Sequence, residues 1–239
     1  CHDGDADIKV IDSKDEQYSY RGSLNSANTN IFIPYPELIS IYNKVNERTN
    51  LGEKSIQKII SSRKPFGLAT DFLNAPDKYT KEPVFEDKQN DTDLEVIGLI
   101  NLKRVSKFIS RDMELIFGEK LIDKWKVFIP YAYGSGTFGE KGPNLIIGEP
   151  GQICTETFLA VGPFEDKVYV DRFIKYFRTR FFRALVGILK TTQHSTGTYG
   201  FVPLEVLYDD TIDWKDSVDN IDKNLYRKYN LTNQEIVFL

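Results

Sequence analysis

Residues 172–203 read RFIKYFRTRFFRALVGILKTTQHSTGTYGFVP, and the fold that we expect is built around this stretch. Its first part repeats apolar side chains four residues apart, at Phe173, Phe177, Phe181, Leu185 and Leu189. This period is typical of one face of a helix. Arginine and lysine fall on or near the opposite face, and no Asp or Glu occurs between residues 172 and 204. The pattern therefore predicts a long amphipathic helix with one buried face and one basic face.

The predicted helix leads into a polar loop at residues 191–200, which is followed by Pro203. A basic helix followed by Gln, His, Ser, Thr and Tyr side chains suits a protein that contacts DNA phosphates and base edges. A surface helix of a globular protein also carries a charged, solvated face by default. The helix alone therefore leaves two interpretations open: a DNA-contacting surface, or a core helix with an ordinary basic outer face.

The composition is that of an ordinary globular protein, since 41% of the 239 residues are hydrophobic and 28% are charged. The formal net charge is −4, so a DNA-binding function has to rest on local charge. Residues 77–95 hold seven acids and three lysines, residues 205–222 hold seven acids and one lysine, and the basic stretch lies between them. No apolar run reaches the roughly 18 residues of a membrane-spanning helix, so we expect a cytoplasmic protein without a membrane partner.

The order of helical and strand patterns favours the α+β class, because the two kinds are mixed without regular alternation. We expect mixed, mainly antiparallel sheets beside the long basic helix. The other expected helices are residues 36–47, 53–62 and 106–124, and a capping box at Thr232 and Glu235 predicts a last short one. The expected strands are residues 8–11, 31–35, 96–102, 126–129, 145–147 and 153–161.

Three parts are expected along the chain. Residues 1–60 form an acidic N-terminal segment with the first helices, residues 61–204 form the central module, and residues 205–239 form an acidic linker with a C-terminal helix. The chain begins with Cys, and we expect it to be a piece of a longer polypeptide. Its two cysteines and two histidines are too few for a zinc site or a disulfide framework, so no metal is expected.

The glycines at positions 134, 136 and 139 spell G-x-G-x-x-G, the spacing of a dinucleotide-binding loop. Such a loop needs a helix directly after it, so that backbone N–H groups face the ligand. Here Lys141, Gly142 and Pro143 follow, and then a short apolar strand. We therefore expect a loop that can close on a ligand and no cofactor in this chain.

A metal-dependent nuclease of the PD-(D/E)xK type is an alternative. Such a site holds a divalent cation between carboxylates next to a lysine. Asp77, Glu86 and Lys88 match the required letters, but the residues between them, which include Pro83, are poor strand material. A protein-interaction domain with an incidental basic helix is a further alternative.

Several stretches carry a resemblance to a known family: SSRKPFGLAT at 61–70, DKWKVFIPYAYGSG at 123–136, EPGQICTETFLAVGPF at 149–164 and YFRTRFFRALVGILKTTQHSTGTYGFVP at 176–203. The final DWKDSVDNIDKNLYRKYNLTNQEI is similar to the usual tail of the same region. The chain resembles the C-terminal target-recognition region of adenine-specific DNA methyltransferases of restriction–modification systems, including the single-chain type IIG enzymes. The resemblance covers residues 61–239.

This resemblance implies a target-recognition domain that docks on double-stranded DNA beside an upstream methyltransferase domain. In the family, the catalytic domain carries an Asn-Pro-Pro-Tyr motif and binds S-adenosylmethionine, and neither that motif nor a suitable cofactor motif occurs in this sequence. The resemblance therefore implies that this chain has no catalytic residue of its own. The parent enzyme would use S-adenosylmethionine, and the type IIG members would also cleave DNA.

Candidate DNA-contacting residues follow from the chemistry of phosphates and base edges. We expect cations on turns and on the long helix to contact phosphates: Arg63, Lys64, Lys103, Arg104, Arg180 and Arg183. We expect loop side chains to contact base edges: Tyr133, Ser135, Thr137, Gln193, His194, Thr196 and Tyr199. For each cation, an ordinary solvated surface charge is the alternative.

Overall fold

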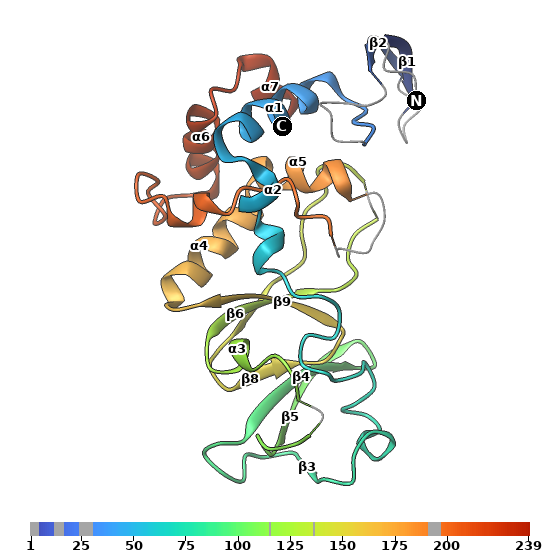
Figure 1. Ribbon diagram of the computed structural model, residues 1–239, viewed down its shortest axis with the longest axis vertical. Coiled ribbons are helices and arrows are strands. Elements are labelled where there is room, and N and C mark those ends of the chain that lie inside the picture. The colour runs from blue at the N-terminus through green and yellow to red at the C-terminus, as the bar shows by residue number, and fades with distance from the viewer. Residues whose placement is uncertain (1–4, 12–16, 24–30, 115, 136, 191–196) are drawn as a thin grey trace.

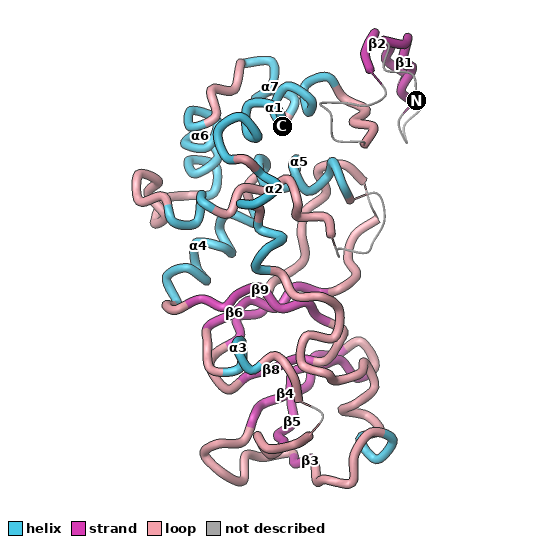
Figure 2. Tube along the Cα trace, viewed as in Figure 1, coloured by secondary structure: helices cyan, strands magenta, loops and turns pink. Residues whose placement is uncertain are grey.

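A computed structural model describes residues 5–11, 17–23, 31–114, 116–135, 137–190 and 197–239. Figure 1 shows an elongated molecule with most helices at one end and strands β3 (Val84–Phe85), β4 (Leu94–Ile100) and β5 (Lys103–Ile109) at the other. The C-terminus lies at the helical end (Figure 1). Helices and mixed sheets confirm the α+β class, and Figure 2 shows most helices in one part of the molecule and most strands in the other, apart from one hairpin at the helical end. Among the described residues, no helix has both the length and the apolar character to cross a bilayer.

The helical end is built from segments that are distant in sequence. They are α1 (Pro36–Thr49), α2 (Leu51–Lys54), α4 (Lys167–Arg178), α5 (Arg180–Leu189), α6 (Val218–Lys228) and α7 (Asn233–Phe238), with single 3-10 turns η2 (Ile56–Ile59) and η4 (Glu205–Tyr208). Pro36 begins α1 as expected, and the capping box of Thr232 and Glu235 begins α7. These local signals placed both helices correctly because they involve only the first turn.

The strands form three sheets. A three-stranded antiparallel sheet has the order β7 (Ile146–Gly148), β6 (Trp125–Pro130), β9 (Phe158–Phe164). A four-stranded sheet has the order β3 (Val84–Phe85), β5 (Lys103–Ile109), β4 (Leu94–Ile100), β8 (Gln152–Cys154), and only its β4–β8 pair is parallel. A separate hairpin pairs β1 (Asp5–Ile11) with β2 (Gln17–Ser23). The remaining short helices are η3 (Pro76–Lys78) and α3 (Glu119–Ile122).

The β7–β6–β9 sheet separates two hydrophobic cores. Val127 and Ile129 of β6 belong to the core of the helical end, whereas Phe128 between them belongs to the core of the sheet end. This alternation follows from the two-residue period of a strand. The core of the helical end collects side chains from residues 33–60, 127–188 and 199–229. The two cores therefore do not follow the expected division at residues 60 and 204.

The expected single basic helix is wrong. Thr179 interrupts it with an extended backbone (φ −65°, ψ 151°), so that α4 and α5 are separate helices. The Thr179 hydroxyl caps α5 by accepting from the Phe182 N–H at 3.1 Å. The Asp222 carboxylate from α6 accepts from Arg180 N–H at 2.9 Å and from Phe181 N–H at 3.0 Å. The apolar four-residue period continues across the break because both helices pack on the same core.

Residues 106–124 were expected to be helical, and that prediction is also wrong. Residues 103–109 pair with β4 as strand β5, and only Glu119–Ile122 is α-helical. Ile109 and Met113 are both buried in the core of the sheet end, so their four-residue spacing imitates a helix across a strand end and a turn. Strands β4 and β5 are joined by Asn101 and Leu102 alone, and Ile100 pairs with Lys103 at the end of the ladder.

Two smaller expectations also fail, and at residues 53–62 the reason is that a remote segment binds the same backbone groups. Residues 31–35 form no strand, and the expected helix at 53–62 is replaced by α2, a bridge from Ser55 to Pro203, and η2. Ile56 N–H donates to Val202 O at 2.8 Å, and Leu204 N–H donates to Lys54 O at 2.8 Å. The expected strand at 153–161 is divided into β8 and β9, with Cys154 fully buried as predicted.

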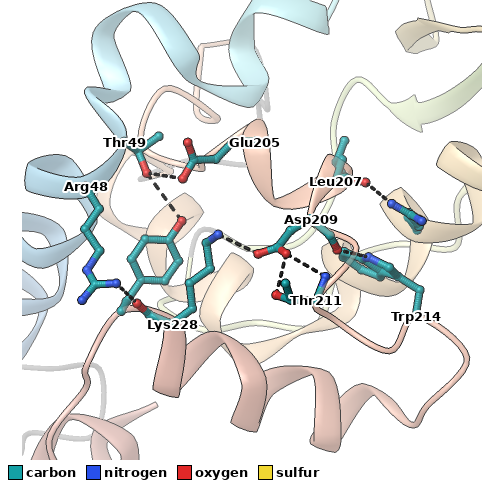
Figure 3. A network of polar contacts seen from close by, with 10 residues as sticks. Arg48, Thr49, Glu205, Leu207, Asp209, Thr211, Trp214 and Lys228 are labelled. Carbon is teal, nitrogen blue, oxygen red and sulfur yellow. Dashed lines mark hydrogen bonds and ion pairs between the residues drawn. The ribbon is translucent and has the colours of Figure 1, made fainter.

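The start of the expected acidic linker is packed against three helices, as Figure 3 shows. Asp209 accepts from Lys228 Nζ at 2.7 Å, and the Asp209 carbonyl accepts from the Trp214 indole N–H at 3.1 Å. Thr49 at the end of α1 donates to Glu205 at 3.1 Å. Burial opposes ionisation of Asp209, but hydrogen bonds from Lys228 and Thr211 outweigh it and lower its pKa. The acids of this segment thus serve the fold of the helical end.

Candidate nucleic-acid interface

The basic residues of α4 bind the acidic segment that follows η4. Arg172 donates from Nη1 to Leu207 O at 3.0 Å and from Nη2 to Asp210 at 2.7 Å. Lys175 Nζ donates to Asp216 O at 2.9 Å. Both side chains are only partly exposed. Arg172 and Lys175 are therefore occupied by contacts within the chain, whereas Arg178 at the end of α4 is exposed.

Arg183 of α5 and Lys190, which directly follows α5, bind the glycine-rich loop. Arg183 donates from Nη1 to Gly139 O at 3.0 Å and from Nε to Thr179 O at 3.3 Å. Lys190 Nζ donates to Tyr133 O at 3.0 Å and to Glu140 Oε1 at 2.5 Å, and the Lys190 and Glu140 side chains are 4% and 18% exposed. The two hydrogen bonds of Arg183 hold the fold together, and its assignment as a phosphate contact stays a prediction.

Arg180 is the exposed basic residue at the start of α5. Its side chain lines a groove of about 770 Å³ at the helical end. The groove mixes both charges and apolar side chains, from Arg180, Asp219, Asp222, Lys223, Tyr226, Arg227, Asn230, Leu231 and Ile236. Burial raises the pKa of Asp222 within it. A groove of mixed charge offers phosphates no uniform attraction.

The glycine-rich loop packs on α5 instead of standing open. Phe138 lies against Gly187, where an added Cβ would approach the Phe138 ring to 2.8 Å. The Phe138 ring also packs on Tyr35 and Phe238, each with ring centroids 5.4 Å apart. Among the described residues, the first element after Gly139 is strand β7 and not a helix, so the loop lacks the geometry of a dinucleotide site. The described part of the expected ligand-closing loop is thus held against the core of the helical end.

The polar side chains of this loop differ in their exposure. Ser135 and Thr137 are exposed and lie close together, with their hydroxyl oxygens 2.6 Å apart, and the Ser135 N–H donates to Glu140 at 2.7 Å. Tyr133 is half-buried, and burial raises the pKa of its hydroxyl. Tyr199 is 0% exposed, with its hydroxyl oxygen 3.4 Å from that of Tyr133. We therefore correct Tyr199 from a base-contacting residue to a core residue.

The turn with Arg63 and Lys64 lies beside β9, where Ser61 N–H donates to Ala160 O at 2.8 Å. The Arg63 guanidinium is 3.3 Å from Glu156 and lies 4.8 Å from the centre of the Tyr131 ring. These contacts fix the direction of Arg63 while leaving its side chain 54% exposed. Lys64 has a left-handed backbone (φ 65°) and an exposed side chain. The sequence correctly predicted a turn that presents this pair.

Lys103 and Arg104 lie at the start of β5, next to the tip of the β4–β5 hairpin, and both are exposed. No hydrogen bond or ion pair joins either side chain to another of the described residues. The Lys64 side chain likewise has no hydrogen bond or ion pair with another described residue. These three cations therefore differ from Arg172, Lys175, Arg183 and Lys190, which are bound internally.

The hairpin tip itself is a feature that sequence reasoning missed. Asn101 and Leu102 both have left-handed backbones, with φ of 50° and 64°, as in a two-residue type I′ turn. Asn suits this conformation, whereas a leucine there costs about 1–2 kcal/mol. Leu102 is nevertheless 92% exposed. Asn101 was the available sequence signal for this turn. It was overlooked because residues 106–124 were expected to be a helix and not the second strand of a hairpin.

The remaining candidates are not joined into a site. Gln193, His194 and Thr196 lie outside the described residues. For the nuclease alternative, Glu86 is 2.8 Å from Lys107, and Asp77 and Lys88 are exposed. Within the described ranges, no group of three His, Cys, Asp or Glu side chains is arranged to hold a metal ion. The nuclease alternative thus gains no geometric support.

A buried lysine, Lys126 of β6, is a further feature that the sequence did not reveal. It is 0% exposed, and its Nζ donates to Ile122 O at 2.8 Å and to Glu149 O at 3.0 Å. Burial lowers its pKa to about 8. Lys126 therefore joins the end of α3 to the turn at Glu149 and is not part of an exposed basic surface.

No protein-family model matches this chain, and no match is found among curated proteins.

Proposed function

We propose that the chain is a DNA sequence-recognition module of an adenine-specific methyltransferase from a restriction–modification system. The stretches that carry the resemblance to that family form the framework: the turn at 61–70, β6, β8, β9, and helices α4 to α7. Methyl transfer and S-adenosylmethionine binding belong, in this proposal, to an upstream domain of the same cytoplasmic enzyme. The 239 residues contribute the contacts to double-stranded DNA.

One observation carries the proposal: the sheet end and its adjoining turn present Lys64, Lys103 and Arg104 without side-chain partners among the described residues. A cation that already donates to a carbonyl or carboxylate has to lose that contact before it binds a phosphate. An exposed, unpaired cation loses only water and counterions, and the release of counterions from DNA favours binding. Within the described chain, the β4–β5 hairpin and the Lys64 turn are therefore better suited to contact phosphates than Arg172, Lys175, Arg183 and Lys190, whatever the net charge of −4.

The test is a salt titration in which fluorescence anisotropy measures the binding of the chain to a pool of short duplexes. Lys103→Gln with Arg104→Gln should weaken binding on all sequences and reduce the slope of log K against log salt by about 2, since each lost phosphate contact contributes about 0.9. Lys215→Gln, an exposed lysine of the helical end without an internal partner, is the matched control and should change neither quantity. An unchanged slope in the double variant would remove the hairpin from the interface.

The assignment of catalysis to another domain is tested separately by calorimetry with S-adenosylmethionine. We expect the 239-residue chain to show no binding heat, because it holds neither the Asn-Pro-Pro-Tyr motif nor a glycine loop followed by a helix. Saturable binding of the cofactor would contradict this division of labour.

A further inference from the structure

We infer that Leu102 is an apolar wedge that enters a groove of duplex DNA and separates stacked bases. This inference rests on the proposed function, which says only that the module contacts DNA. It adds which residue reaches the bases and what that residue does to them. The argument combines the backbone of the hairpin tip, the exposure of Leu102 and the placement of the neighbouring cations.

The backbone at the tip favours a residue other than leucine. Both turn residues have positive φ, and the second position of a type I′ turn is usually Gly, because Gly has no Cβ to clash there. A large side chain at this position strains the turn and gains no packing in return, since Leu102 is 92% exposed. Strained residues of this kind cluster at binding sites. The isolated fold therefore gives no reason for a leucine at the tip.

The neighbouring residues point to nucleic acid as the partner. Lys103 and Arg104 follow Leu102 directly, and consecutive residues of a strand project to opposite faces of the ribbon. One cation thus lies on each side of the tip, and neither is bound within the described chain. A groove of DNA has a phosphate strand on each side of its base edges. The tip matches this order, with an apolar side chain in the middle and a cation on either flank.

The size of the hairpin is also suitable for entry into a DNA groove. A two-stranded ribbon can enter a DNA groove, and proteins that kink DNA insert Leu, Ile, Phe, Met or Pro between base steps. β4 and β5 pair along seven residues each, with Ile100 opposite Lys103 at the closing end. The ladder holds the tip at a defined place on the sheet end. Insertion of Leu102 needs no rearrangement of the ladder.

The test compares Leu102→Gly with Leu102→Met in the 239-residue chain. Gly removes the side chain and suits the left-handed turn, so the urea midpoint of this variant should be no lower than that of the native chain. Its affinity for duplex DNA should nevertheless fall about tenfold, the order expected for losing one buried leucine side chain. Met keeps an apolar side chain of similar volume and should retain the affinity.

Permanganate oxidation of unstacked thymines in the same duplex pool reports the wedge itself. The native chain and Leu102→Met should raise thymine reactivity, and Leu102→Gly should not. Val237→Ala is the matched control, because Val237 is 86% exposed on α7, at the helical end, and should affect neither readout.

The outcomes separate the inference from the function on which it rests. If the native chain binds DNA but leaves thymines unreactive, or if Leu102→Gly binds and unstacks DNA like the native chain, the wedge is refuted and the recognition function stands. If Leu102→Gly converts a dimer into a monomer in sedimentation, Leu102 is a self-association contact and the wedge is again refuted. Absence of any duplex binding by the native chain would refute the proposed function.

Discussion

Helices α4 and α5 and the β4–β5 hairpin both carry closely spaced lysine and arginine residues, but the structure uses them in opposite ways. Arg172, Lys175 and Arg183 donate to backbone carbonyls of segments that are distant in sequence. Lys103 and Arg104 donate to no described residue. The stretch with the highest local positive charge is therefore mainly internal reinforcement. The shorter pair on the hairpin is the better candidate for an external partner.

The largest effect that tests this contrast is expected at the buried pair of Lys190 and Glu140. Lys190→Met leaves a carboxylate that is 18% exposed without its ammonium partner, and breaking such a pair costs about 3 kcal/mol. Urea unfolding should show this loss, whereas Lys103→Gln with Arg104→Gln should stay within about 0.5 kcal/mol of the native chain. Equal losses in both variants would end the distinction between internal and external cations.

The buried Lys126 side chain makes the stability of the fold depend on pH. Its pKa is about 8 in the folded chain and about 10.4 in an unfolded chain. Between these values the unfolded state binds more protons than the folded state, so stability rises with pH, by up to about 3 kcal/mol. Below pH 8 both states are protonated and the contribution is constant.

The measurement is the difference in unfolding free energy between the native chain and Lys126→Met from pH 7 to pH 10.5, the range set by the two pKa values. The variant lacks the titrating group, so the gap between the two proteins should change in favour of the native chain as pH rises. A gap that is independent of pH would mean that Lys126 keeps an ordinary pKa despite its burial.

A smaller effect is expected at Arg183, which holds Gly139 O through its guanidinium at 3.0 Å. Arg183→Met should destabilise the chain by about 1–2 kcal/mol, because a partly buried carbonyl loses a charged donor. Its affinity for duplex DNA should equal that of the native chain. A fall in affinity without a fall in stability would return Arg183 to the DNA-contacting surface.

Some features of this fold were accessible to sequence reasoning because they depend on neighbours along the chain. Pro36 at the start of α1 and the capping box at Thr232 and Glu235 placed two helices. The turn at Arg63 and Lys64 was predicted from Pro65 and Gly67, and its backbone is left-handed at Lys64. Each of these signals acts over at most four residues.

Other features were misread because a local pattern had a remote cause. Ile109 and Met113 looked helical, but they flank a strand end and face a common core. Tyr199 looked like a loop residue that could contact a base, but the core of the helical end buries it completely. The sequence pattern could not distinguish these cases, since the burial of a side chain depends on segments that approach it only in the folded chain.

The sequence by itself determined the α+β class, the apolar faces of the main helices and the places where lysine and arginine gather. Only the tertiary structure decided which of those cations remain available. The partners of Arg172 and Lys190 lie 35 to 57 positions away in the chain, at Leu207, Asp210, Glu140 and Tyr133. Periodicity records which face of a helix is buried, whereas a hydrogen bond between distant segments exists only after the chain has folded.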